Sequence, residues 1–166
     1  MILVCNTGPL IALAKIQRLS LLQHLGIAQV LIPPMVQKEL WGKLGPESPT
    51  IEAALSTFIR VANLPNIDPH LEHVTVDLDQ GEKEAVLLAA SLQEYVVLLM
   101  DDQAGRTVAS ELKLHVLGTV GLLLLAKRRG LVERMTPLMD EIRRQGYWLS
   151  DALVERVRRL AQEEEA

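Results

Sequence analysis

Two adjacent carboxylates, Asp101 and Asp102, follow directly on an apolar run near the middle of the chain. Asn6 and Thr7 follow the apolar run at residues 2–5 in the same way. Both runs are typical of buried strands, and in open parallel sheets ligands bind at the carboxyl ends of the strands. Hard cations such as Mg²⁺ and Mn²⁺ take oxygen ligands from carboxylates and water. The pattern therefore indicates a divalent-cation site at this edge, with an amide where a further acid is expected.

Two acids on predicted helices, Glu39 and Glu84, can extend this cluster because each lies beside apolar residues. Thr119 follows another predicted strand end and adds a hydroxyl. Glu82 lies three positions after Asp79, which is the spacing of a capping box, and capping accounts for it. A divalent ion bound at such a cluster makes water a nucleophile for phosphodiester hydrolysis. The expected chemistry is thus metal-assisted hydrolysis.

A simpler interpretation of the paired aspartates stays open. Asp101 or Asp102 can cap the helix that begins near Gln103, because a carboxylate accepts N–H groups of a first helical turn. The histidines show no metal-ligand spacing; a loop is expected at residues 63–70, and His70 and His73 fall in this loop region. No glycine-rich phosphate-binding loop follows the first strand. These features leave the acids as the candidates for chemistry.

Strand and helix signals alternate along the chain, and the strands are almost continuously apolar. This pattern predicts a three-layer α/β/α fold, with a central mostly parallel sheet of four or five strands covered on both faces. Strands are expected at residues 2–5, 30–32, 58–62, 96–100 and 115–117. Helices are expected from Thr7 and at residues 19–22, 35–41, 50–56, 85–92, 103–112, 119–129, 137–145 and 151–164.

Composition restricts the class of protein. The chain has 166 residues, of which 49% are hydrophobic, and this is typical of one domain with a large aliphatic core. Cys5 is the sole cysteine and lies in an apolar run, so we expect a buried thiol without a disulfide. No secretory signal and no apolar stretch of the ~20 residues that a membrane span needs is evident, which favours a cytoplasmic protein. The run at residues 163–165 predicts a solvated acidic tail.

The net charge of −4 argues against non-specific coating of nucleic acid, so contacts to phosphates require local basic clusters. The candidates are Arg106, Lys15 and the run Lys127, Arg128 and Arg129. The basic run is equally well explained as charge that offsets the dipole at a helix C-terminus. Both interpretations remain open at this point.

The chain resembles the PIN-domain superfamily, metal-dependent ribonucleases that include the toxins of prokaryotic toxin–antitoxin pairs. The resemblance covers residues 1 to about 145, in order, and is carried by residues 4–13, 31–40, 81–85, 99–106 and 116–124. It implies a PIN-like domain at residues 1–145 followed by a C-terminal helical extension at residues 146–166. It also implies a ring of acids that binds Mg²⁺ or Mn²⁺.

Position by position, the second acid of the family falls on Glu39 and the third on Glu84, where an acid–Ala pair begins the helix. The fourth falls on Asp102, with Asp101 as an alternative register. The hydroxyl after the first acid falls on Thr7, and the small polar residue after the last strand falls on Thr119. These matches place the expected catalytic and metal-binding residues at the edge of the sheet.

The first acid of the family falls on Asn6, and here the chain departs from the pattern. An amide carbonyl oxygen is neutral, so the cation should bind more weakly. The resemblance implies an RNA-cleaving endoribonuclease, the toxin of a toxin–antitoxin pair, with a homodimer and a small antitoxin protein as partners. The alternative is a catalytically weakened or inactive PIN-like module that binds RNA or protein.

Overall fold

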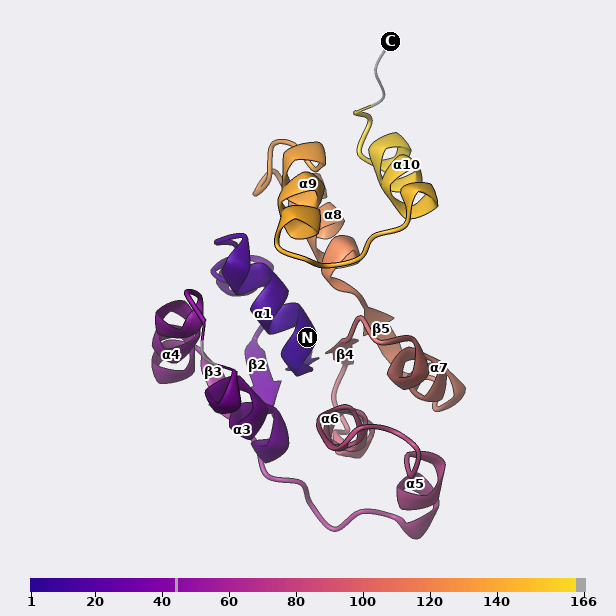
Figure 1. Ribbon diagram of the computed structural model, residues 1–166. Coiled ribbons are helices and arrows are strands. Elements are labelled where there is room, and N and C mark those ends of the chain that lie inside the picture. Colours follow the sequence, from indigo (N-terminus) through magenta and orange to yellow (C-terminus); the bar gives the residue numbers. More distant parts are fainter. Residues whose placement is uncertain (44, 164–166) are drawn as a thin grey trace.

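The computed structural model describes residues 1–43 and 45–163, and within them five strands form one all-parallel sheet (Figure 1). The strand order is β3-β2-β1-β4-β5, so the chain begins at the centre of the sheet and extends it first to one side and then to the other. The strands are β1 (Ile2–Cys5), β2 (Gln29–Ile32), β3 (Ile59–Val61), β4 (Val96–Leu99) and β5 (His115–Leu117).

Ten helices lie within the same described residues. They are α1 (Thr7–Lys15), α2 (Leu21–His24), α3 (Pro34–Gly42), α4 (Ser48–Thr57), α5 (Pro69–Val74), α6 (Gln80–Ser91), α7 (Gln103–Glu111), α8 (Thr119–Arg128), α9 (Thr136–Arg144) and α10 (Asp151–Leu160). The three-layer α/β/α fold expected from the sequence is therefore confirmed, with all five strands parallel.

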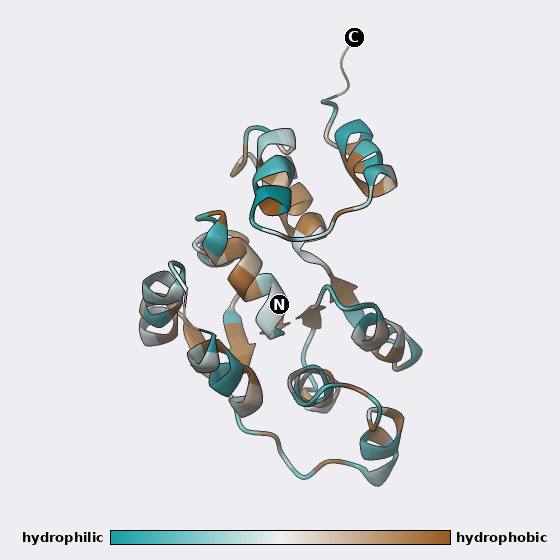
Figure 2. Cartoon of the chain, viewed as in Figure 1, coloured by the Kyte–Doolittle hydropathy of each residue, from teal (hydrophilic) through white to brown (hydrophobic). Residues whose placement is uncertain are grey.

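The alternation of side chains along each strand creates two core clusters, one on each face of the sheet. Leu3 and Cys5 of β1 pack with α1 and α8 on one face, whereas Ile2 and Val4 pack with α6 and α7 on the other. The strands are mostly hydrophobic, with Gln29, Arg60 and His115 as exceptions, and the outward faces of the flanking helices are hydrophilic (Figure 2). Each fully buried aliphatic side chain contributes roughly 1.5–3 kcal/mol to folding.

The strand order reverses between β1 and β4, which makes their carboxyl ends the switch point where open α/β sheets bind ligands. The backbone N–H of Asn6 donates to the carbonyl of Leu99 at 3.0 Å, so the residue after β1 is held beside the end of β4. Burial raises the pKa of the Cys5 thiol above its usual range, and Cys5 is therefore a structural residue, as expected.

Two local expectations were wrong. The segment expected to be a loop enters α5 at Pro69, so His70 and His73 lie on a helix. The Asp68 carboxylate accepts the N–H of His70 at 2.7 Å, and a proline at the first helical position favours helix initiation. The helix expected from Ala85 begins five residues earlier, at Gln80.

The C-terminal helices pack against the rest of the chain. Val154 and Val157 of α10 are buried in the same core cluster as β1 and α1. The acidic run expected to be a solvated tail begins with Glu163, whose side chain is only 6% exposed; residues 164 and 165 lie outside the described residues. The boundary between a PIN-like domain at residues 1–145 and a helical extension at residues 146–166 stays a prediction. In the described part of the chain, no helix is long and apolar enough to cross a membrane.

Candidate active site

Glu39 is the acid most firmly fixed at the switch point. It lies on α3, which begins where Pro33 and Pro34 end β2, and its side chain is partly buried. The Thr7 hydroxyl, itself 3% exposed at the start of α1, donates to Oε2 of Glu39. The hydroxyl after β1 therefore holds the acid of α3 at the end of the central strand.

The Glu39 carboxylate also lies directly against α6. A Cβ atom at Gly81 would lie 2.7 Å from the carboxyl carbon of Glu39, which is closer than real Cβ contacts allow. A larger residue at this position would require the Glu39 carboxylate to shift away from the first turn of α6. The next residue along α6 is Glu82, and the charge of Glu39 is one of those that raise its pKa.

Glu82 lies in the electrostatic field of these acids, in addition to the capping role expected for it. Burial raises the pKa of Glu82, and the negative charges of Asp102, Asp79 and Glu39 raise it further, against a hydrogen bond from the Asp79 backbone that lowers it. The hydrogen bond is one half of the expected capping box; the Asp79 side chain makes no cap bond. Glu82 is therefore the site acid that sequence reasoning underrated.

Glu84, in contrast, is engaged away from the cluster. Its Oε2 accepts the backbone N–H of Met35 at 2.9 Å, and its Oε1 accepts the side-chain amide of Gln80 at 3.1 Å. Because α6 begins at Gln80 rather than at Glu84, Glu84 lies in its second turn. Both of its carboxylate oxygens are thus engaged by Met35 and Gln80.

The paired aspartates have different partners. Asp102 is the N-cap of α7, and its Oδ1 accepts the N–H of Gly105 at 3.0 Å, as the capping interpretation expects. Asp101 binds Thr119 with both oxygens, accepting its N–H at 2.7 Å and its hydroxyl at 2.6 Å. Asp101 thus ties the end of β4 to the start of α8, and Asp102 is the one whose charge acts on Glu82.

Asn6 is 7% exposed and is the N-cap residue of α1, yet its side chain makes no capping hydrogen bond. Its backbone N–H binds the end of β4, and the next residue, Thr7, holds Glu39. This placement agrees with the position at the carboxyl edge of the sheet that was expected for Asn6. It contributes a neutral oxygen where a carboxylate would add a charge.

The expected basic residues are mostly engaged within the chain. Arg106 donates to the carbonyl of Met100 at 2.9 Å, and Arg129 donates to the carbonyl of Leu25. Lys127 forms an ion pair with Glu163 at 2.8 Å, and Lys15 lies 5.7 Å from the ring centre of Tyr147. Arg128 is exposed at the end of α8. The structure therefore favours a structural role for Lys127 and Arg129.

Tyr147 is a further residue near the site that the sequence did not single out. Burial raises its pKa to about 12, with smaller contributions from the charges of Glu47 and Asp101. The loop between α9 and α10 thus brings a half-buried phenol into the field of the acid at the end of β4. Trp148, the next residue, is 86% exposed.

The donor set suits a hard divalent ion, but it is not a closed cage. Within residues 1–43 and 45–163, no three His, Cys, Asp or Glu side chains surround one point closely enough to hold a metal. Mg²⁺ commonly keeps several waters and uses one or two carboxylates together with substrate phosphates. Burial and the charges of Asp102, Asp79 and Glu39 make ionisation of Glu82 less favourable, and a cation beside Glu82 would offset this effect. The acids present therefore fit such an ion.

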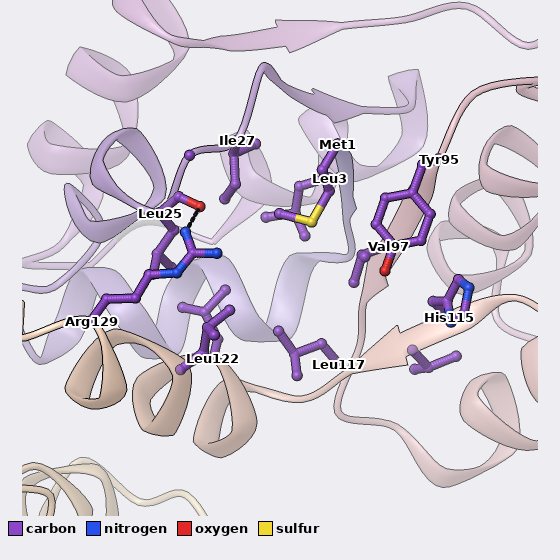
Figure 3. Close-up of a pocket in the computed structure, with 13 residues that line it drawn as sticks. Met1, Leu3, Leu25, Ile27, Tyr95, Val97, His115, Leu117, Leu122 and Arg129 are labelled. Atoms are coloured by element: carbon purple, nitrogen blue, oxygen red, sulfur yellow. Dashed lines mark hydrogen bonds between the residues drawn. The ribbon is translucent and has the colours of Figure 1, made fainter.

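A cavity of about 510 Å³ lies at the opposite edge of the sheet (Figure 3). It is lined by apolar side chains at the amino ends of the strands, and Arg129 crosses one end to reach the Leu25 carbonyl. Tyr95 and His115 stack at its other end, with ring centres 5.1 Å apart. None of its lining residues belongs to the acid cluster, so the cavity is separate from the candidate active site.

An all-parallel α/β/α sheet with acids gathered at its switch point defines an α/β protein with a ligand site at the carboxyl edge. Residues 2–163 match a family model described as a PIN domain, and the chain belongs to the PIN-domain family. This is a nuclease-type fold; its members are generally metal-dependent and commonly bind RNA. No curated protein matches the chain.

Proposed function

We propose that the chain is a cytoplasmic endoribonuclease that hydrolyses RNA phosphodiester bonds with Mg²⁺ or Mn²⁺. The observation that carries this proposal is the gathering of Glu39, Glu82 and Asp102 at the switch point of a PIN-domain fold. The family assignment supplies the class of chemistry, and the negative charge that Asp102 and Glu39 place around Glu82 supplies the reason to expect a bound cation. Glu82 takes the place that sequence comparison gave to Glu84.

Each residue of the cluster has a distinct task in this proposal. Glu39, fixed by Thr7 and by its packing on Gly81, and Glu82 supply carboxylate oxygens from two helices. Asp102 adds negative charge while it caps α7, and Asn6 adds a neutral carbonyl oxygen. When bound, a divalent ion supplies an activated water and stabilises charge on the scissile phosphate. Because Asn6 is neutral, the cluster carries one negative charge fewer than it would with an acid at position 6, and we therefore expect slow cleavage.

Single-stranded RNA needs cationic and aromatic contacts around such an acidic centre. Arg128 is exposed but lies at the end of α8 remote from Thr119, whereas Trp41 and Trp148 are 59% and 86% exposed. Base stacking on such side chains adds about 1–3 kcal/mol per base. These exposed side chains support binding of RNA in an unpaired form.

We further propose that the chain is the toxin of a toxin–antitoxin pair and that it forms a homodimer. The apolar stripes of α9 and α10 are buried against the chain's own core, so a partner must use other surface. Leu153 and Leu160 of α10 remain 37% and 47% exposed and are available to a second copy or to a small antitoxin protein. Light scattering of the purified chain, alone and with the product of any adjacent small gene, tests both partners.

A non-catalytic module that binds RNA or protein is the second candidate function. Two observations favour it: the amide of Asn6 at the position of the first acid, and the absence of a tight group of three ligands among the described residues. In that case the fold would retain RNA or protein affinity without hydrolysis. The two candidates differ in whether a divalent ion leads to cleavage.

Cleavage of an RNA panel with Mn²⁺ separates the candidates. The endoribonuclease predicts products from the natural chain that are lost with EDTA and in both Glu39→Ala and Glu82→Ala. The matched control is Glu72→Gln, which removes a carboxylate that pairs with Lys83 on the outer side of α6. Asn6→Asp adds a charge to the cluster and should increase both Mn²⁺ affinity and cleavage. RNA binding without cleavage, converted to cleavage only by Asn6→Asp, would establish the non-catalytic module.

A further inference from the structure

Helix α3 begins without a cap from its own sequence. Its N-cap residue is Pro33, which has no side-chain acceptor, and the structure shows no cap hydrogen bond from it. The first N–H groups of a helix need partners, and an anion near them is favoured by the helix dipole. Glu84, 49 positions along the chain from Met35, supplies that partner from α6 by accepting the Met35 N–H at 2.9 Å.

A second contact joins the same two helices one turn away. Glu39 of α3 packs against Gly81 of α6, three residues before Glu84. The two helices are therefore pinned at two points, by Glu84 at the start of α3 and by Glu39 near its end. Glu82 lies between Gly81 and Glu84 on α6. The separation of the Glu39 and Glu82 carboxylates depends on how these two helices sit against each other.

The Glu84 carboxylate is itself held in place. The Gln80 side chain, one turn earlier on α6, donates to Oε1 at 3.1 Å, which leaves Oε2 to accept from Met35. Glu84 is partly buried, so its hydrogen bond to α3 is shielded from water on one side. A carboxylate oriented in this way is occupied by two donors and faces a helix terminus.

We infer that Glu84 is a positioning residue: it caps α3 from α6 and so sets the spacing of Glu39 and Glu82, without contacting the cation itself. This inference rests on the proposed function, because the spacing of Glu39 and Glu82 matters only if the two carboxylates bind a cation. It also explains why an acid stands at position 84 although its carboxylate is not part of the cluster. Residues that orient ligands in this way typically change metal affinity by about 10–100-fold when removed.

A comparison of Glu84→Gln with Glu84→Ala tests the inference by Mn²⁺ titration calorimetry on the full chain. Glutamine keeps an oxygen that can accept the Met35 N–H, so Glu84→Gln should retain Mn²⁺ affinity close to that of the natural chain. Alanine cannot, and Glu84→Ala should lose about tenfold. Glu82→Gln should lose affinity although the side chain keeps its size, because the neutral amide oxygen attracts the cation less strongly than a carboxylate does. Glu72→Gln is the charge-matched control and should bind normally.

Hydrogen exchange of the Met35 amide gives a readout that does not depend on metal. The amide should be protected in the natural chain and in Glu84→Gln, and should exchange faster in Glu84→Ala. Equal loss of Mn²⁺ affinity in Glu84→Gln and Glu84→Ala would make Glu84 a ligand and overturn the inference. Unchanged affinity, or unchanged Met35 exchange, in Glu84→Ala would also overturn it. A natural chain that binds no Mn²⁺ would overturn the proposed function, and the cap would then be judged on Met35 exchange alone.

Discussion

Thr7 and Glu39 are joined by a hydrogen bond that crosses from the first residue of α1 to an acid on α3. The bond links two segments that enter the site from different strands, because α1 follows β1 and α3 follows β2. Thr7 is almost fully buried, so water cannot replace Glu39 as the hydrogen-bond partner of its hydroxyl. The Glu39 carboxylate is thereby held at the carboxyl end of the central strand before any cation arrives.

Replacement of Thr7 by valine removes this hydrogen bond while the size of the side chain is retained. A hydrogen bond to a charged group contributes about 1.5–3 kcal/mol, so the free energy of unfolding should fall by about that amount. Mn²⁺ affinity should fall about tenfold because Glu39 is no longer oriented. Urea unfolding and calorimetric titration measure the two effects. Thr7→Ser restores the hydroxyl and should recover Mn²⁺ affinity; the absence of recovery would show that the hydroxyl is not what orients Glu39.

Replacement of Glu82 by glutamine should change stability and metal binding in opposite directions. Burial and the charges of Asp102, Asp79 and Glu39 raise the pKa of Glu82, so its ionisation at neutral pH is less favourable in the folded chain than in the unfolded chain. Without metal, Glu82→Gln should therefore unfold at a higher temperature at pH 7. The gain should disappear as the pH falls below the ordinary pKa of a glutamate, where both states are protonated.

Thermal unfolding in EDTA and in Mn²⁺ provides the measurement. Glu82→Gln should gain less stability from Mn²⁺ than the natural chain, because the stabilisation by an ion that binds the folded state increases with its affinity. If Glu82→Gln is less stable than the natural chain in EDTA at pH 7, neighbouring acids do not destabilise the charged form of Glu82.

Asp101 and Asp102 should separate into a structural and a functional residue. Asp101→Ala removes both hydrogen bonds to Thr119 and should lower the free energy of unfolding by about 2 kcal/mol, without a change in Mn²⁺ affinity. Asp102→Ala removes an N-cap, at a cost of about 1 kcal/mol, and should also weaken Mn²⁺ binding. Chemical denaturation and calorimetry of the two variants check this. A loss of Mn²⁺ affinity in Asp101→Ala would return Asp101 to the set of ligands.

The order of strands and helices could be predicted from the sequence because its causes are local. Apolar runs that end in polar residues, such as the run before Asp101, fix each strand end, and turn residues fix most helix starts. The parallel sheet follows from the alternation of strands and helices. Convergence of Asn6 and Asp102 at one edge then follows from topology, and the structure places both residues there.

The choice between Glu82 and Glu84 could not be made in this way. Two positions along an α-helix turn a side chain by about 200°, so the two acids point to different sides of α6. Which side faces the cluster depends on where α3 packs, and that depends on contacts remote in sequence, such as Glu39 on Gly81. One local signal was available: a glycine directly before Glu82 indicates a close approach by another segment.

Glu163 shows a further limit, because its partners come from distant elements. Its carboxylate pairs with Lys127 at 2.8 Å and accepts the Met135 and Thr136 N–H groups at the start of α9, at 2.6 and 2.9 Å. An acidic run near a chain end is usually solvated, and nothing local distinguishes Glu163 from the residues that follow it. The contacts tie the end of α10 to α8 and α9.

The stability of the chain should therefore depend on pH through Glu163. Although burial raises the pKa of Glu163, the hydrogen bonds from Lys127, Met135 and Thr136 outweigh it and lower the pKa from 4.5 to about 2. The folded chain thus favours the charged form, and this contribution is present above the unfolded pKa and is lost as the pH falls from 4.5 toward 2. At pH 7, Glu163→Gln should lower the free energy of unfolding by about 2 kcal/mol.

Urea unfolding of the natural chain and of Glu163→Gln between pH 7 and pH 2 measures this contribution. The difference between the two should shrink as the pH falls, because the natural carboxyl becomes protonated and resembles the amide. Glu155→Gln removes a carboxylate from an exposed pair with Arg158 and should change stability little at any pH, since exposed ion pairs contribute at most about 1 kcal/mol. A difference between the natural chain and Glu163→Gln that stays constant down to pH 2 would mean that packing, rather than the charge of Glu163, holds the C-terminal helices on the sheet.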